Sequence, residues 1–214
     1  MKKIIFIIAV VIGFNSFVNA QVEDKKAREI LDQVSAKAKS LKNMKFEFTY
    51  NMIDPKHKIN ETLKGTIVMM GQKFNLSFMG RTIISDGTTV WTYDKNANEI
   101  QISNVDPKND ALNPGKLLTS YDKSYKAKLI KTETVAGKVI HIIDITPIAG
   151  KAFYKIRLTI DKAEMRVTSG TVYNKDNKTY TYTVNKFTAN VQATDDMFKM
   201  DSKKYPGAEL IDMR

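Results

Sequence analysis

Residues 45–52, KFEFTYNM, decide the class of fold because their side chains alternate between polar and apolar. Successive side chains of a β-strand point to opposite faces of its sheet, so a period of two indicates a strand with one buried face. The apolar positions are Phe46, Phe48, Tyr50 and Met52. The stretch therefore predicts a sheet with one face against an apolar interior and the other in water.

The same alternation recurs along most of the chain, between turns rich in Gly, Asn, Asp and Pro. It places on the buried face Leu63, Gly65, Ile67 and Met69, and then Phe74, Leu76 and Phe78. The pair Asp86-Gly87 is typical of a hairpin turn. Further strands are expected over 90–93, 99–103, 125–133, 139–146, 153–161, 166–173 and 179–188, with a last short one at 197–200. The sequence thus predicts about eleven strands in one antiparallel sheet.

Two helices interrupt this pattern. Residues 25–42 repeat their apolar side chains with the period of an amphipathic helix. Asn113-Pro114 has the form of an N-cap followed by proline at the first helical position, which predicts a short helix that carries Leu117 and Leu118. Two helices cannot cover so many strands, so we expect the sheet to curl into a barrel or partial barrel with the helices across its opening.

Residues 1–20 have the three parts of a secretory signal peptide. Lys2 and Lys3 precede an apolar run, and small residues lead to Ala20, after which cleavage is expected. Residues 21–214 contain no linker long enough to divide them, which predicts one exported, soluble domain.

The composition disfavours an enzyme. The chain has no cysteine and two histidines, His57 and His141, and neither stands at the spacing of a metal site or a catalytic triad. None of its serines lies in a Gly-x-Ser-x-Gly elbow. We therefore expect no catalytic residues, no metal and no cofactor.

The formal net charge is +11, but the lysines are spread along the chain and form no single stripe. This spread argues against a nucleic-acid partner. Two interpretations remain, a solvated basic surface or a weak, transient contact with an anionic membrane surface. The apolar interior also has two interpretations, because its Phe, Met, Leu, Ile and Tyr side chains could fill a core or line a ligand cavity.

Three motifs of this chain resemble those of the periplasmic outer membrane lipoprotein carrier family, LolA. The first is a strand that begins at Gly65, followed by the pair Lys73-Phe74. The second is Ser85-Asp86-Gly87 with Trp91-Thr92-Tyr93-Asp94 shortly after it, and the third is Thr194-Asp195-Asp196-Met197-Phe198. The resemblance covers most of the mature chain.

The resemblance implies a mainly β (α+β) fold, an unclosed antiparallel β-barrel of about eleven strands with an N-terminal amphipathic helix and a short helical lid. It implies a monomeric periplasmic carrier that shields the acyl chains of a lipoprotein cargo. Cargo would pass from an inner-membrane release complex to an outer-membrane acceptor. The same half-barrel could instead bind or transport another lipid or amphiphile. The residues expected to form the cavity and its lid are Phe46, Phe48, Tyr50, Leu63, Ile67, Met69, Phe74, Leu76, Phe78, Trp91, Leu117 and Leu118.

One position departs from the family pattern. Familiar members place an Arg-Pro pair just before the Lys-Phe element, and that arginine is taken to latch the lid. Here the corresponding residues are Met70-Gly71-Gln72. Gln72 could donate only a neutral hydrogen bond, so the charge-assisted latch is missing at this position.

Overall fold

The structure is a computed structural model that describes residues 16–106, 125–148 and 152–214, with side chains from residue 25 onward. The predicted lid helix after Asn113-Pro114, with Leu117 and Leu118, lies outside the described residues. Within them, the prediction of a mainly β fold with an N-terminal helix and an unclosed sheet is confirmed.

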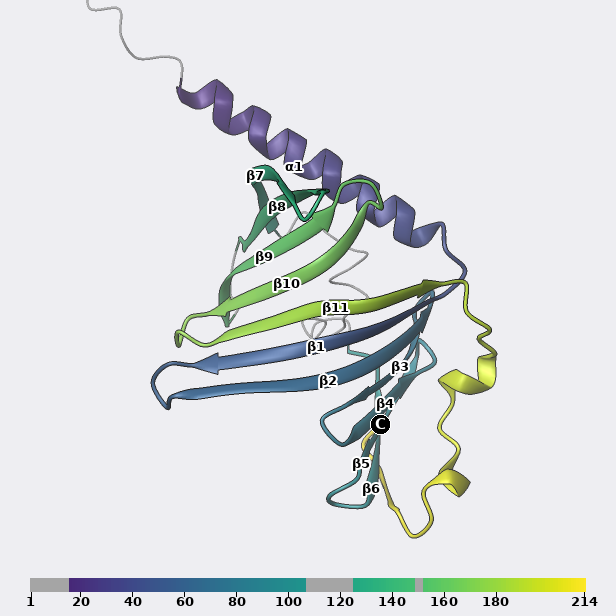
Figure 1. Cartoon of the computed structure of the whole chain (residues 1–214). Coiled ribbons are helices and arrows are strands. Elements are labelled where there is room, and N and C mark those ends of the chain that lie inside the picture. The colour runs from purple at the N-terminus through teal and green to yellow at the C-terminus, as the bar shows by residue number, and fades with distance from the viewer. Residues whose placement is uncertain (1–15, 107–124, 149–151) are drawn as a thin grey trace, which may run out of the picture.

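Twelve strands form a single sheet (Figure 1). They are β1 (Met44–Asp54), β2 (Ile59–Met70), β3 (Lys73–Phe78), β4 (Arg81–Ser85), β5 (Thr89–Asp94), β6 (Glu99–Asn104), β7 (Tyr125–Val135), β8 (Lys138–Pro147), β9 (Phe153–Asp161), β10 (Arg166–Asn174), β11 (Thr179–Ala189) and β12 (Glu209–Asp212). The order is β12-β6-β5-β4-β3-β2-β1-β11-β10-β9-β8-β7, so β12 and β7 are the two edges. Every neighbouring pair is antiparallel except β12 and β6, which run parallel.

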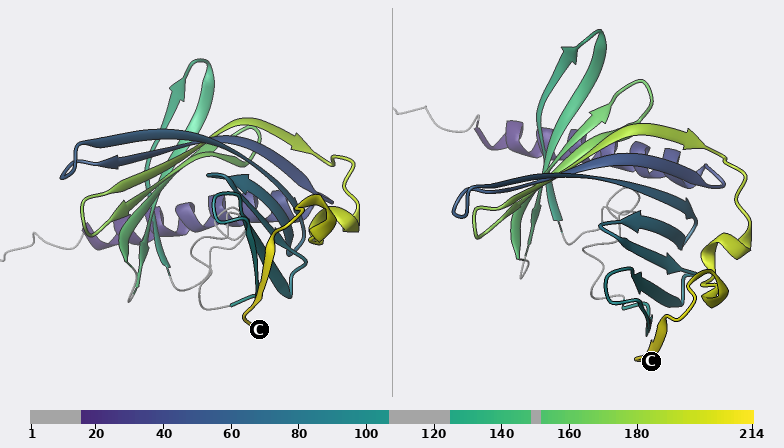
Figure 2. Two further views of the ribbon diagram at one scale, coloured as in Figure 1. Left: turned by 90° about the horizontal axis from the view of Figure 1, so that it is seen from below. Right: turned by 60° about the horizontal axis from the view of Figure 1, so that its bottom comes forward.

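The sheet is strongly curved, and the helix α1 (Ser16–Lys39) crosses its concave side (Figure 2). The helix begins earlier than the expected residue 25, so the predicted cleavage position after Ala20 falls within its span. It ends at Lys39, before the expected end at residue 42. Lys37 and Lys39 lie in its last turn, where cations interact favourably with the helix dipole.

The first apolar core lies between α1 and the concave face of β7–β10. Ala27, Ile30, Leu31 and Val34 form the buried stripe of the helix, at the spacing that the sequence predicts. The sheet contributes to this core Ala127, Ile143, Ile145, Phe153, Ile156, Leu158, Ile160 and Val167. The helix therefore covers one half of the concave face.

The second core is an aromatic cluster on the same face of β1–β3 and β11. The ring centroids of Tyr50 and Phe78 are 5.2 Å apart in an edge-to-face arrangement, and those of Tyr50 and Tyr182 are 5.1 Å apart. The ring of Phe48 lies over Gly65, where an added Cβ would come within 2.3 Å of its Cζ. Glycine at this position therefore allows the ring to lie flat on the neighbouring strand.

The C-terminal segment covers part of the convex face. The Asn75 side chain on β3 donates a 2.7 Å hydrogen bond to the carbonyl of Met197, and Lys73 forms an ion pair with Asp195. Phe198 is completely buried at the end of the 3-10 helix η2 (Asp195–Phe198), and a second 3-10 helix, η3 (Ser202–Lys204), follows. The prediction of a strand at 197–200 was wrong, because the last strand is β12, which begins only at Glu209.

Candidate functional site: an apolar cavity on the concave face

A cavity of about 410 Å³ opens on the concave face, and none of its lining residues comes from α1. This volume is within the range of sites that bind small molecules. The cavity lies beneath the strands in the middle of the sheet, β1, β2 and β9–β11. Its apolar lining consists of Phe46, Phe48, Tyr50, Ile67, Ala152, Phe153, Ile156, Leu158, Val167, Val172, Tyr180, Tyr182 and Val184.

The strand register explains why these side chains meet. Tyr50 of β1 faces Tyr182 of β11, which faces Gly170 of β10, which in turn faces Leu158 of β9. Directly paired residues lie on the same face of a sheet, so one row across four strands points into the cavity. Gly170 has no side chain to fill the space in this row. Leu158 Cδ2 would be 3.4 Å from a Cβ placed there, an ordinary contact, so the backbone leaves room for a larger residue.

A second hollow of about 570 Å³ adjoins the first near the C-terminal end of α1. Both hollows are lined by Phe46 and Val167, so they share a wall. The charged residues around the second hollow are Lys37, Arg166 and Glu164, and the Arg166 guanidinium forms an ion pair with the Glu164 carboxylate. The same guanidinium lies 4.6 Å from the centre of the Phe187 ring. The apolar surface therefore continues from the aromatic cluster to the end of α1, where Lys37 and the Arg166–Glu164 pair border it.

Four side chains of the cavity lining carry hydroxyl groups: Ser169 and the tyrosines Tyr50, Tyr180 and Tyr182. Burial raises the pKa of Tyr50 to about 12, and the neighbouring Tyr182, Tyr180 and Glu61 contribute in the same direction. Burial also raises the pKa of Tyr182. The raised pKa values keep the hydroxyls of Tyr50 and Tyr182 neutral over the physiological range, so these two groups present no charge to an apolar guest.

We expect the folded protein to lose stability in alkali because of Tyr50. Above about pH 10 an unfolded tyrosine gives up its proton, whereas the folded one holds it to about 12, so the unfolded state is favoured increasingly as pH rises. Between about pH 9 and about pH 11, the free energy of unfolding measured with urea should fall less for Tyr50→Phe than for the wild type. Equal losses in the two proteins would contradict this assignment.

Four of the residues predicted to form the cavity line it: Phe46, Phe48, Tyr50 and Ile67. Five others lie on the same face, within or against the aromatic cluster: Leu63, Met69, Phe74, Leu76 and Phe78. Trp91 does not join them, contrary to the expectation. Asn75 lies on the convex face, where it is hydrogen-bonded to the C-terminal segment. Ile84 pairs with Asn75, and Trp91 pairs with Ile84. Trp91 therefore lies on the convex face as well.

The part of the lining that comes from β9–β11 was not predicted from the sequence. Ile156, Leu158 and Val172 alternate with polar residues just as the predicted positions of β1 do, so the signal was present in the pattern. β1 and β11 are distant in sequence, and their pairing brings the lining residues of β1 next to those of β9–β11.

The concave face becomes polar on β4–β6. Arg81 and Asp94 face each other across β4 and β5, with Nε and Oδ2 2.8 Å apart. Glu99 and Gln101 continue this face on β6, joined by a 2.7 Å hydrogen bond. The apolar wall therefore ends near β3, and the cavity belongs to the centre of the sheet.

An unclosed, curved β-sheet with a helix across it and an apolar cavity beneath it defines a binding or carrier protein of the half-barrel type. The chain belongs to the outer membrane lipoprotein carrier protein LolA family, whose model matches residues 39–201. That match includes β1–β11 and η2, and therefore every strand that lines the cavity. Members of this family are carrier or binding proteins and not enzymes.

Solved structures share the fold at low sequence identity. An uncharacterised conserved protein from Thermus thermophilus superposes with a TM-score of 0.61 at 14% identity, over 87% of this chain and 99% of that one. A DUF1329 family protein from Desulfovibrio piger gives 0.51 at 11% identity, over 83% and 97%. A Vibrio parahaemolyticus domain provisionally described as an outer membrane lipoprotein-sorting protein gives 0.50 at 12%, over 82% and 97%.

No curated protein matches the sequence. Among the described residues, no helix is both long enough and apolar enough to cross a membrane.

Proposed function

We propose that this protein is a periplasmic carrier that shields the acyl chains of lipoproteins in the concave cavity and moves them from the inner to the outer membrane. The observation that carries the proposal is the apolar cavity of about 410 Å³ beneath β1, β2 and β9–β11. Membership of the lipoprotein carrier family and the predicted signal peptide support it.

The size and chemistry of the cavity suit a hydrocarbon chain. A methylene group occupies about the volume of a water molecule, roughly 30 Å³, so the cavity holds roughly a dozen of them. Each methylene removed from water contributes about 0.8 kcal/mol. Transfer of a hydrocarbon chain of this length from water into the cavity is therefore favourable. The adjoining hollow near α1 extends the apolar surface for a second chain.

The carrier must also release its cargo. The segment Met70-Gly71-Gln72 stands where familiar members have an Arg-Pro pair. Met70 ends β2, and Gly71 and Gln72 form the turn to β3. The Gln72 side chain forms no hydrogen bond among the residues that the structure describes. We therefore propose that apolar contact, without a charge-assisted latch at this turn, holds the cargo, and that an outer-membrane acceptor of higher affinity removes it.

The alternative is transport of another lipid or amphiphile by the same cavity. The observation that favours it is the exposed Lys37 at the second hollow, which forms no ion pair with another described residue, because an amphiphile with an anionic head would interact with it. Mass spectrometry of the lipids that purify with the protein distinguishes the two. Lipoprotein acyl chains support the first proposal, and a different bound lipid supports the second.

Purified protein is expected to bind a fluorescent acyl probe saturably, with micromolar or better affinity, because the chain leaves water for a preformed apolar site. A lipoprotein with intact acyl chains should displace the probe, and the same polypeptide without its acyl chains should not. Lack of saturable binding would contradict any lipid-carrier role. Displacement by the non-acylated polypeptide would contradict recognition through the acyl chains.

A further inference from the structure

Exposed apolar side chains gather at one end of the sheet. Ten large hydrophobic side chains of the described residues are markedly exposed, and four of them belong to strand ends and connections on the same side. They are Ile53 and Ile59, at 39% and 41%, and Ile148 and Tyr154, at 59% and 48%. Single exposed apolar residues are ordinary on a protein surface, but a group of them at one end marks an interaction surface.

One hydrogen bond and one ion pair join the connections that carry these residues. Lys178, in the turn between β10 and β11, lies 3.6 Å from the buried Asp54 carboxylate at the end of β1. The amide of Lys175 in the same turn donates to the carbonyl of Ala152, just before β9. Figure 1 shows the β1–β2 and β10–β11 turns side by side at this end. We name this surface the hairpin rim: residues 53–59, 148, 152–154 and 174–178.

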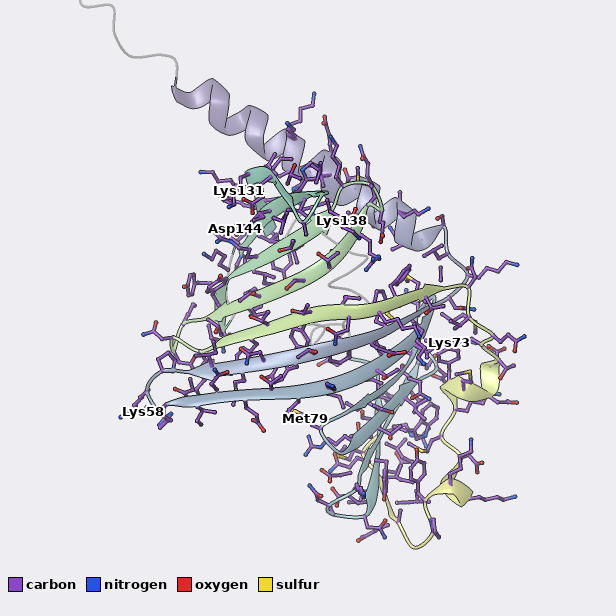
Figure 3. All side chains as sticks on the ribbon, viewed as in Figure 1. Lys58, Lys73, Met79, Lys131, Lys138 and Asp144 are labelled. Carbon is purple, nitrogen blue, oxygen red and sulfur yellow. The ribbon has the colours of Figure 1, made fainter. Side chains whose placement is uncertain are left out.

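The hairpin rim is also basic. Lys56, Lys58 and Lys175 are exposed, and none of them forms an ion pair with another described residue. Lys58 stands at the tip of the β1–β2 turn, directed away from the sheet (Figure 3). Asp54 and Asp176, the acids of the rim, are already paired with Lys178. The rim therefore presents free cations next to exposed apolar side chains, the combination that attracts a protein to anionic lipid.

The cavity reaches the same end of the sheet. Four of its lining residues, Ala152, Phe153, Asn174 and Tyr180, lie in or beside the connections that form the rim. A guest that enters at this end would pass the exposed isoleucines before it meets the tyrosines of the cavity.

We propose that the hairpin rim docks on an anionic membrane surface, with its isoleucines in the headgroup region and its lysines on lipid phosphates, so that the cavity mouth meets the bilayer. This inference rests on the proposed carrier function. Docking spares the acyl chain a passage through water, which is unfavourable for exposed hydrocarbon. It also predicts contact that is weak and sensitive to salt.

Co-sedimentation with vesicles tests the docking. Wild-type protein is expected to sediment with vesicles of phosphatidylcholine and phosphatidylglycerol in equal parts, far less with phosphatidylcholine alone, and less at about 0.5 M than at about 0.05 M salt. Lys56→Glu with Lys58→Glu should weaken binding more than about tenfold. Lys203→Glu with Lys204→Glu, an exposed pair in η3, is the matched control and should weaken it much less.

The apolar half of the rim has its own pair of variants. Ile59→Glu with Ile148→Glu should weaken vesicle binding, because charged side chains do not enter the headgroup region readily. The matched control is Leu210→Glu with Met213→Glu, side chains exposed to 58% and 57% on the C-terminal segment. The control should bind vesicles more strongly than the rim variant.

Binding of the acyl probe without vesicles separates this inference from the proposed function. All four double variants should bind the probe as the wild type does, because none of the changed residues lines the cavity. Failure of wild-type protein to bind anionic vesicles, or equal losses in rim and control variants, overturns the docking even where probe binding is intact. It is overturned as well if the rim variants lose only a protein partner while vesicle binding persists.

Discussion

Gly170→Leu is expected to weaken acyl-chain binding about 100-fold while the protein remains folded. Gly170 lies in the row of residues that points into the cavity, between Leu158 and Tyr182. A leucine there adds four carbons to the space that a guest would occupy. At about 0.8 kcal/mol for each methylene displaced, the loss is about 3 kcal/mol. Titration with a fluorescent acyl probe measures it.

The same position offers a graded series and a matched control. Gly170→Ala adds one carbon and should weaken binding about fourfold, since its Cβ makes only an ordinary contact with Leu158. Thr171→Leu changes the next residue of β10, which points to the convex face, and should leave binding unchanged. Thermal unfolding of Gly170→Leu should match or exceed that of the wild type, because glycine weakens a strand. Wild-type binding by a folded Gly170→Leu protein would show that this cavity is not the acyl site.

The concave wall of β1–β3 could be predicted from sequence because it is regular. From Phe46 to Met52 the alternation is unbroken, and the partner strand repeats it from Leu63 to Met69. With no shift in register between these strands, one period of two identifies the whole inner face. The structure agrees with the prediction at every one of these positions.

Trp91 could not be placed in the same way. The strand before it carries two adjacent isoleucines, Ile83 and Ile84, one on each face of the sheet, so the apolar pattern there has no single face. The register determines the face on which Trp91 lies, because Trp91 pairs with Ile84 and not with Ile83. A one-residue difference in register moves every side chain of a strand to the other face, and the sequence of β4 and β5 does not specify which register holds.

The strand predicted at 197–200 is absent for a related reason. Met197 and Met200 flank Phe198 in a short apolar stretch that resembles a strand. Local sequence does not show that these side chains instead cover apolar residues on the convex face of the sheet. In the structure Val68, Ile84 and Ile100 are buried on that convex face, as is Phe198 in the segment that is hydrogen-bonded to it. The convex face of β2–β6 is therefore partly covered by the C-terminal segment.

Phe198→Ala is accordingly expected to cost about 3–5 kcal/mol in the free energy of unfolding, the loss typical of a fully buried phenylalanine. Met213→Ala, in the same segment but 57% exposed, should change it by less than about 0.5 kcal/mol. Urea unfolding measures both. Phe198 and the cavity lie on opposite faces of the sheet, so acyl-probe binding should persist in Phe198→Ala under conditions where the protein is folded. A cost below about 1 kcal/mol would mean that the C-terminal segment unfolds separately from the sheet, and the convex face would then be stable without its cover.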